Sequence, residues 1–282
     1  MQFEFPWALG PEPGRYTIRE QLGEAPAHVL VVTALGAPQR RLLPRRRRGS
    51  VAAAPGPPPE PVMTSRATLV DTAALDGYEA AAAWLAGADL DALAGAALLR
   101  LNRVLHAHRI AAADPYAREV ARAQALVVRV GFGNGESVAD GRWDRARELP
   151  RAGPAALRGG AGRVSALRPQ ERLAALLAAR DVALACEELT LRTRADADAG
   201  RWREAALGLR IAFEAALAEL EPWREVRGLP ERLAELREYR SGVGAVANAA
   251  LQGGVDDAQI EFITTVLGRI EAALRARTAG GV

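Results

Sequence analysis

Apolar and polar residues alternate over short stretches near the start of the chain, a pattern that favours strands. Residues 15–20 alternate as in a half-buried strand, and residues 28–35 carry β-branched side chains in their middle. Residues 66–71 resume the pattern. Between them lies the segment 38–65, whose Arg, Pro and Gly residues suit neither a ladder nor a helix. We therefore expect a small antiparallel sheet that is interrupted by a disordered Arg- and Pro-rich linker at 38–65.

Stretches rich in Ala and Leu follow the strands and predict helices. Residues 77–86 and 89–111 contain mainly these strong helix formers. Pro115 suits the first position of a helix that Asp114 could cap, so a short helix over 115–123 is expected. Within 89–111, one face carries residues at spacings of 3, 4 and 3, namely Leu98, Leu101, Leu105 and His108.

A Gly-rich segment then separates two further stretches. Residues 125–130 predict a strand, and Asn134-Gly135 is the dipeptide favoured in tight hairpin turns, with residues 136–139 as the returning strand. The sequence GFGNG also superficially resembles a phosphate-binding loop. Such a loop must open directly into a helix, and the residues that follow lack the apolar stripe of a long one. A hairpin or surface loop is therefore the expectation.

The rest of the chain predicts four amphipathic helices, after a linker at 150–164 that is rich in Gly, Arg and Pro. The first is expected from Pro169 to Gly200, and Gly253-Gly254 ends the third. Each apolar stripe needs a partner, which an antiparallel bundle provides. The stripes consist of Leu173, Leu177, Leu184 and Leu191; Trp202, Ala205, Leu209, Ala212, Ala216 and Leu220; Leu229, Leu233, Leu236, Val243 and Val246; and Ile260, Ile263, Leu267, Ile270 and Leu274.

These patterns together predict a mainly helical member of the α+β class. A small N-terminal antiparallel sheet with helices is expected over 1–149, and a four-helix bundle-like domain over 165–282. Gly242 and Gly244 weaken the third helix of the second domain. They indicate either a close approach between two helices or a break into two shorter ones.

Composition excludes several kinds of chemistry. The 282 residues include 37 basic ones, all of them Arg, so a Walker-A loop, a Schiff-base lysine and a pyridoxal-phosphate anchor are excluded. One cysteine, Cys186, rules out an intramolecular disulfide framework and a cysteine-based zinc site. Because Glu187 and Glu188 follow it, we expect this thiol to be a small apolar filler rather than a nucleophile.

Positive charge is concentrated in one short segment. The formal net charge is +3, yet residues 40–48 hold six Arg and no acid, so the other residues together carry a net charge of −3. This segment, the Arg arm, is a candidate site for phosphate, for an anionic membrane surface or for an acidic partner. The alternative is a soluble linker whose composition follows codon usage. The residues are Arg40, Arg41, Arg45, Arg46, Arg47 and Arg48.

Two histidines offer the remaining candidate chemistry. His106 and His108 point about 200° apart on a helix, so they cannot chelate one ion, and no metal site is expected. Arg103 and His108 have the R-x4-H spacing of HEPN-type ribonucleases, which this segment resembles. The resemblance implies that His108 acts as general base and that Arg103 binds the phosphodiester. Val104 departs from the polar residue that usually follows the Arg, and a packed His108 is the alternative.

The sequence thus predicts a non-enzymatic protein without a catalytic site or a cofactor. Our first hypothesis is a protein–protein interaction or scaffold module whose C-terminal helices bind a second copy or another helical protein. The alternatives are a nucleic-acid- or phosphate-associated protein that uses the Arg arm, and a HEPN-like ribonuclease. No stretch approaches the roughly 18–20 apolar residues of a membrane span, and no secretory signal is recognised, so a cytoplasmic location is expected.

Overall fold

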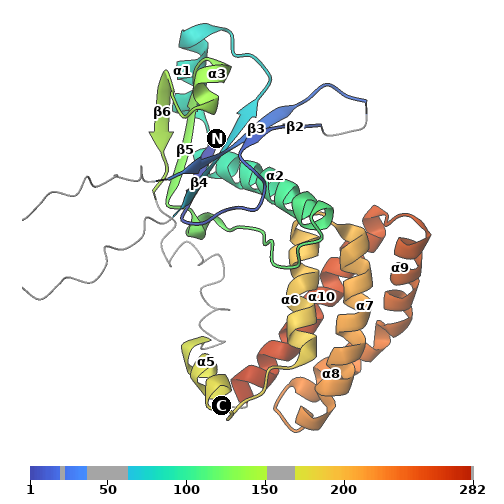
Figure 1. The fold of residues 1–282 in the computed structure, drawn as a ribbon. Coiled ribbons are helices and arrows are strands. Elements are labelled where there is room, and N and C mark those ends of the chain that lie inside the picture. Colours follow the sequence, from blue (N-terminus) through green and yellow to red (C-terminus); the bar gives the residue numbers. More distant parts are fainter. Residues whose placement is uncertain (20–22, 37–62, 151–168, 281–282) are drawn as a thin grey trace, which may run out of the picture. The chain divides into compact units, whose positions relative to one another are not determined.

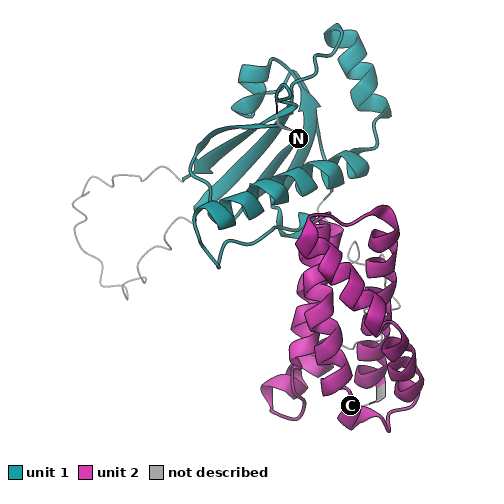
Figure 2. Cartoon of the chain, turned by 90° about the vertical axis from the view of Figure 1, so that its right-hand side faces the viewer, with its two compact units in different colours: residues 1–157 teal, residues 158–282 magenta. Residues whose placement is uncertain are grey.

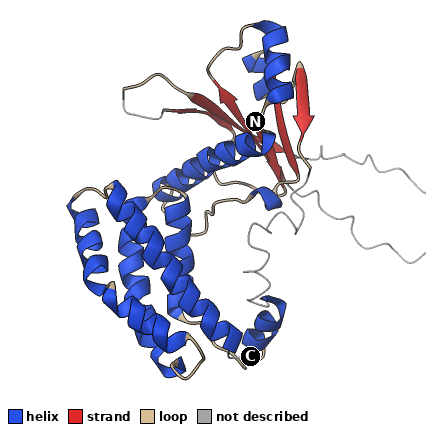
Figure 3. Cartoon of the chain, turned by 180° about the vertical axis from the view of Figure 1, so that it is seen from behind, coloured by secondary structure: helices blue, strands red, loops and turns tan. Residues whose placement is uncertain are grey.

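A computed structural model describes residues 1–19, 23–36, 63–150 and 169–280. The chain forms two compact units, Met1–Leu157 and Arg158–Val282, which Figure 2 distinguishes by colour. The predicted α+β class is confirmed: an antiparallel sheet in the N-terminal unit precedes a helical unit (Figure 3).

Unit 1 contains a six-stranded antiparallel sheet in which the first strand lies inside the sheet (Figure 1). The order is β2-β3-β4-β1-β5-β6. Phe3 of the first strand pairs with Ala67 on one side and with Val128 on the other. The strands are β1 (Gln2–Phe5), β2 (Gly14–Ile18), β3 (His28–Leu35), β4 (Thr64–Asp71), β5 (Val127–Phe132) and β6 (Arg145–Glu148).

The structure confirms the strands expected over 15–20, 28–35, 66–71 and 125–130 as β2, β3, β4 and β5, and it corrects the end of the expected linker. Thr64 and Ser65, which we assigned to the linker at 38–65, belong to β4. Ser65 is buried because it pairs with Phe5 of β1, a strand that the sequence pattern did not predict. Residues 38–62 of that linker lie outside the described residues.

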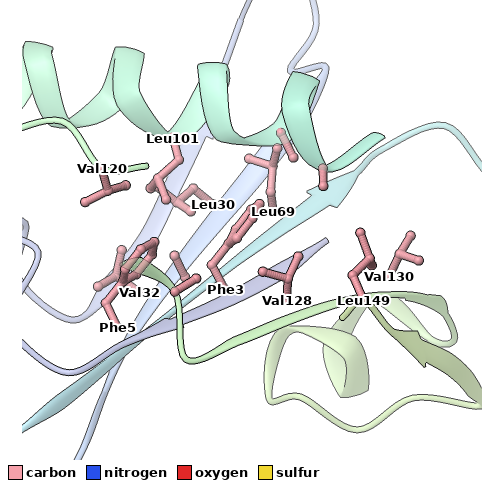
Figure 4. Packing of buried hydrophobic residues seen from close by; sticks show 14 of the residues in the cluster. Phe3, Phe5, Leu30, Val32, Leu69, Leu101, Val120, Val128, Val130 and Leu149 are labelled. Atoms are coloured by element: carbon pink, nitrogen blue, oxygen red, sulfur yellow. The ribbon is translucent and has the colours of Figure 1, made fainter. Parts of the chain in front are cut away.

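One face of the sheet carries the apolar core. Side chains alternate along a strand, so Phe3 and Phe5 point to this face while Gln2 and Glu4 point to the other. Helix α2 (Leu90–Ala111) covers the apolar face, as expected from its Leu101 and Leu105 (Figure 4). The labelled core residues are Phe3, Phe5, Leu30, Val32, Leu69, Leu101, Val120, Val128, Val130 and Leu149.

A sharp corner joins α1 (Gly77–Gly87) to α2. Ala88 is extended, and the Asp89 carboxylate accepts hydrogen bonds from the amides of Asp91 and Ala92, which caps α2. The two helix axes therefore differ in direction by 97°. Among the described residues no single helix is long and apolar enough to cross a membrane, although this bent pair passes the same test of length and composition.

The opposite face of the sheet carries a network of polar side chains. Arg66 donates to the Glu4 carboxylate at 2.9 Å, and Arg129 donates to Glu148 at 3.0 Å. Gln2 is fully buried there and donates to the Thr68 hydroxyl. Because each of these polar groups has a partner, the network can lie against the sheet without leaving an uncompensated charge.

The prediction of a tight hairpin after β5 is wrong, because a longer connection that contains a short helix joins β5 to the returning strand. Asn134 does not form a two-residue turn; its side chain accepts the Glu136 amide and begins the short helix α3 (Gly135–Ala139). The strand that returns is β6, whose residues lie beyond the expected 136–139. The helix expected over 115–123 is also wrong, since the only helical turn described there is η1 (Arg122–Gln124).

Unit 2 is a bundle of more, shorter helices than the four we predicted. The first predicted helix divides at residues 178–184, where Ala179 has a φ of +53°, and the third divides at Tyr239. The first predicted stripe is wrong in three of its four residues, since Leu173, Leu177 and Leu191 are exposed. The described elements are α5 (Pro169–Leu177), α6 (Ala185–Asp198), α7 (Trp202–Glu219), η3 (Glu221–Trp223), α8 (Leu229–Glu238), α9 (Arg240–Gln252) and α10 (Asp257–Gly280).

The last helix supplies the centre of the bundle. Ile263, Leu267 and Ile270 are fully buried in the core of unit 2. Asp256 caps this helix as expected: its carboxylate accepts the Gln259 amide, and the Gln259 side chain accepts the Asp256 amide. The apolar stripe that we expected to attract a partner is thus covered by helices of the same unit.

Candidate functional site

A cleft of about 820 Å³ opens in unit 1 at one end of the sheet. His28 begins β3, Asp71 ends β4 and Phe132 ends β5, so antiparallel pairing brings all three to that end. Helices α1 and α3 lie at the same end, as Figure 1 shows, and residues of both α1 and α2 line the cleft. The cleft therefore lies where six separate segments of unit 1 converge.

Aromatic side chains gather around this cleft. The whole chain has 14 aromatic residues, and four of them line the cleft: Tyr78, Trp84, Phe132 and Trp143. The ring of Tyr78 meets the ring of Phe132 edge-on, with 5.4 Å between centroids and 74° between planes. The indole nitrogen of Trp143 is buried and has no hydrogen-bond partner within the described part of the chain.

Small residues keep the space open. Ala81, Ala96 and Ala97 face the cleft from α1 and α2, where larger side chains would fill it. Leu69, Leu93 and other aliphatic side chains complete an apolar lining. A concave, mainly apolar site with a few polar groups at fixed positions is the usual form of a small-molecule site.

The polar groups of the lining come from segments that are far apart in the sequence of unit 1. His28 Nε2 lies 3.8 Å from Asp71 Oδ2, and the two residues face each other in the register of β3 and β4. The Thr72 hydroxyl donates to the carbonyls of Pro26 and Ala27, which ties the following loop to β3. Arg100 of α2 and Asp144, just before β6, also line the cleft.

Sequence reasoning did not find this site. His28 and Asp71 were read only as the ends of two strands, and nothing in their local sequence marks them as a pair. Strand register was the missing signal, because an antiparallel pairing of 28–35 with the next strand places the first residue opposite the last.

The residues that resembled a ribonuclease motif lie elsewhere in unit 1. Neither Arg103 nor His108 lines the cleft. The His108 ring instead lies against Gly10, whose φ is +113° and where an added Cβ would come within 2.9 Å of the ring. His106 Nδ1 is 3.9 Å from Glu119. Within the described segments, no three His, Cys, Asp or Glu side chains are grouped so as to hold a metal ion.

The Gly-rich segment after β5 has a structural explanation. A Cβ on Gly131 would come within 2.4 Å of the Arg145 carbonyl of β6, and one on Gly133 would meet the Asp144 amide at 3.0 Å. These glycines therefore let β6 and the end of its connection pack closely against β5. The Arg arm, Arg40 to Arg48, lies outside the described residues.

Unit 2 holds a second cluster of polar groups, in its interior. The Arg277 side chain is only 2% exposed and donates to Asp181 at 2.6 Å, while Arg172 forms two hydrogen bonds with Glu187. The Arg277 guanidinium also lies 4.4 Å above the Trp223 ring. These pairs join α5, α6 and α10, so their evident effect is to hold the helices together.

Cys186 lies next to this cluster, and its surroundings make the thiol unreactive. Burial raises the pKa of its thiol to about 12, and the neighbouring Glu219 carboxylate, which accepts the Cys186 amide, adds to the effect. Almost no thiolate therefore exists at neutral pH. This environment agrees with the expectation that Cys186 is a small apolar filler.

Comparison with known proteins gives no relative from which a function could be transferred. No protein-family model matches the chain, and neither a curated protein nor a solved structure matches it significantly.

Proposed function

We propose that this protein is a non-enzymatic binding protein whose unit 1 holds a small, mainly apolar molecule in the cleft at the end of its sheet. The observation that carries the proposal is the concave lining, in which Tyr78, Trp84, Phe132 and Trp143 surround a volume of about 820 Å³. This volume falls within the range of about 300–1,000 Å³ that is typical of ligand sites. The polar groups at its margin would orient the molecule.

The hypothesis of association through the C-terminal helices has less support. Its motivation was the apolar stripe of the last helix, and that stripe is buried inside unit 2, for example at Ile263 and Ile270. Exposed apolar residues remain on and after α5, at Leu173, Leu177 and Val182. Nothing described in unit 2 favours a particular partner for them. Nucleic-acid binding through the Arg arm stays a prediction from sequence.

Binding can be tested with two neutral probes that have the same number of non-hydrogen atoms, indole and 1-octanol. Each would be titrated into the full-length protein while methyl NMR signals are recorded. Signals of Leu69, Leu75, Val130 and Val138 should shift on addition of either probe, because these side chains line the cleft. If neither probe shifts them, the proposal is wrong.

A matched pair of variants locates the binding. Ala96→Phe places a ring in the cleft and should weaken binding of both probes by about tenfold or more, since the apolar volume is filled. Ala107→Phe adds the same ring on the exposed side of α2 and should leave binding unchanged. Equal affinities for the two variants would place the probes elsewhere and overturn the proposal.

A further inference from the structure

We infer that the ligand of the cleft is a neutral, planar heteroaromatic molecule that presents an N–H donor. This inference rests on the proposed function and specifies the chemical class of the ligand. Three properties of the lining support it: the nature of its walls, its balance of charge and the position of one carboxylate.

The walls favour a flat ring over an alkyl chain. Four aromatic side chains reach the cleft from α1, from the end of β5 and from the segment before β6. Tyr78 is 55% exposed and Trp84 is 37% exposed, so both keep ring surface that a ligand can cover. Aromatic pairs gain more from offset or edge-on contact than their buried area alone provides, and this gain requires a ring in the ligand.

The charges of the lining favour a neutral molecule. The lining contains two carboxylates, Asp71 and Asp144, and one guanidinium, Arg100. His28 lies beside Asp71, and the Tyr78 phenol is neutral at pH 7. The described side chains around the cleft thus provide no excess of positive charge. A ligand carboxylate or phosphate would meet two like charges, which disfavours its binding.

The position of Asp71 favours a donor on the ligand. Its Oδ1 accepts the Ala73 amide, and its side chain is 68% exposed at the margin of the cleft. A carboxylate oxygen accepts more than one hydrogen bond, and bonds to a charged acceptor are the stronger ones. An N–H on the edge of a bound ring can therefore use this group while the ring face contacts the aromatic walls.

Four probes separate these properties in the full-length protein. Indole is planar, neutral and carries one N–H; benzothiophene has the same shape without the donor; 1-octanol is neutral but flexible; and indole-3-acetate adds a negative charge. Affinities would be measured from the same methyl signals. We expect indole to bind about tenfold more tightly than 1-octanol and about threefold more tightly than benzothiophene. Indole-3-acetate should bind more weakly than indole.

Two variants connect the preferences to residues. Tyr78→Leu should lower the affinity for indole by about fivefold and change that for 1-octanol less than twofold, because only the ring loses its contact. Asp71→Ala should make indole and benzothiophene bind equally. Leu75→Ala, on the loop before α1, is the control. It shortens an apolar lining residue without removing a ring or a charge, so it should leave the relative affinities for the probes unchanged.

The outcomes distinguish this inference from the proposal beneath it. If 1-octanol binds in the cleft as tightly as indole, or if indole-3-acetate binds more tightly than indole, the inferred ligand class is wrong and the cleft remains a ligand site. If indole and benzothiophene bind equally to the unchanged protein, the donor is wrong. If no probe shifts the methyl signals of the cleft, the inference and the proposed function both fail.

Discussion

Arg277 shows how a single buried charge can hold several helices. Its side chain is 2% exposed and is paired with Asp181 and Glu187, and its guanidinium lies over the Trp223 ring. Removing one partner of a buried ion pair leaves the other charge buried without compensation. The resulting loss of folding free energy usually exceeds the stability that the intact pair contributed.

Arg277→Met should therefore destabilise the protein by about 3–5 kcal/mol. Arg192→Met is the matched control, because Arg192 is 71% exposed and its pair with Glu188 is worth at most about 0.5 kcal/mol. Urea unfolding followed by far-ultraviolet circular dichroism measures both changes. Equal unfolding midpoints for the two variants would show that the cluster contributes little.

The same cluster makes stability depend on pH. Burial alone acts to raise the pKa of Asp181, but hydrogen bonds from the Val182 amide and Arg172, with the nearby Arg277 guanidinium, outweigh it and hold that pKa below its ordinary value of 3.8. Because the folded state binds the proton less readily than the unfolded state, this contribution is complete above about pH 5 and is lost as the pH falls through and below 3.8.

Asp181→Asn should remove this dependence. The variant should be less stable than the unchanged protein at neutral pH, and the difference should shrink as the pH is lowered from 5 to 2, since the wild-type carboxylate is then being protonated. Urea unfolding at a series of pH values measures it. A difference that stays constant with pH would mean that the ionised carboxylate is not the stabilising form.

At the scale of helices, two glycines in α9 have opposite roles. A Cβ on Gly242 would lie 2.5 Å from the Phe262 ring of α10, whereas a Cβ on Gly244 would meet nothing within 4 Å. Gly242 thus marks the close approach of two helices, one of the alternatives that the sequence suggested. The break between α8 and α9 is at Tyr239, before either glycine.

Gly244→Ala should stabilise the protein by about 0.5–1 kcal/mol, because alanine loses less backbone entropy in a helix. Gly242→Ala should destabilise it by about 1–3 kcal/mol, since the Phe262 ring must move away from its contact with Tyr239. Thermal unfolding of the two variants compares them directly. A gain in stability from both would show that the approach of α9 and α10 is loose.

The helices and strands were predictable where one local pattern decided the outcome. The strand over 28–35 and the helices that begin near residues 77 and 90 follow from β-branched and Ala/Leu composition. β1 was missed because it has only four residues and is decided by its two neighbours in the sheet. The division between α5 and α6 was missed because the chain turns at Ala179, a non-glycine residue with a φ of +53°, and the Asp181 that follows pairs with distant Arg277. The cleft was not predictable, because it is formed by the register of paired strands and by packing between elements. A local sequence pattern contains neither kind of information.

At the scale of the whole molecule, each unit has a core of its own. Core residues of unit 1 lie between Phe3 and Leu149, and those of unit 2 between Cys186 and Ala273. A separate core is the main requirement for independent folding. Residues 158–282, produced alone, should therefore show a helical circular dichroism spectrum and a cooperative thermal transition. A fragment that is helical but melts without cooperativity, or is unfolded, would show that unit 2 needs the rest of the chain.

The place of β1 between β4 and β5 has a consequence for how the protein is made. On the ribosome, the first strand emerges early, but one of its neighbours follows some sixty residues later and the other only after residue 127. Until then the nascent chain carries an apolar strand with unpaired edges, a state that promotes aggregation. Synthesis stalled before β5 should thus call for chaperones, because the second neighbour of β1 is then missing.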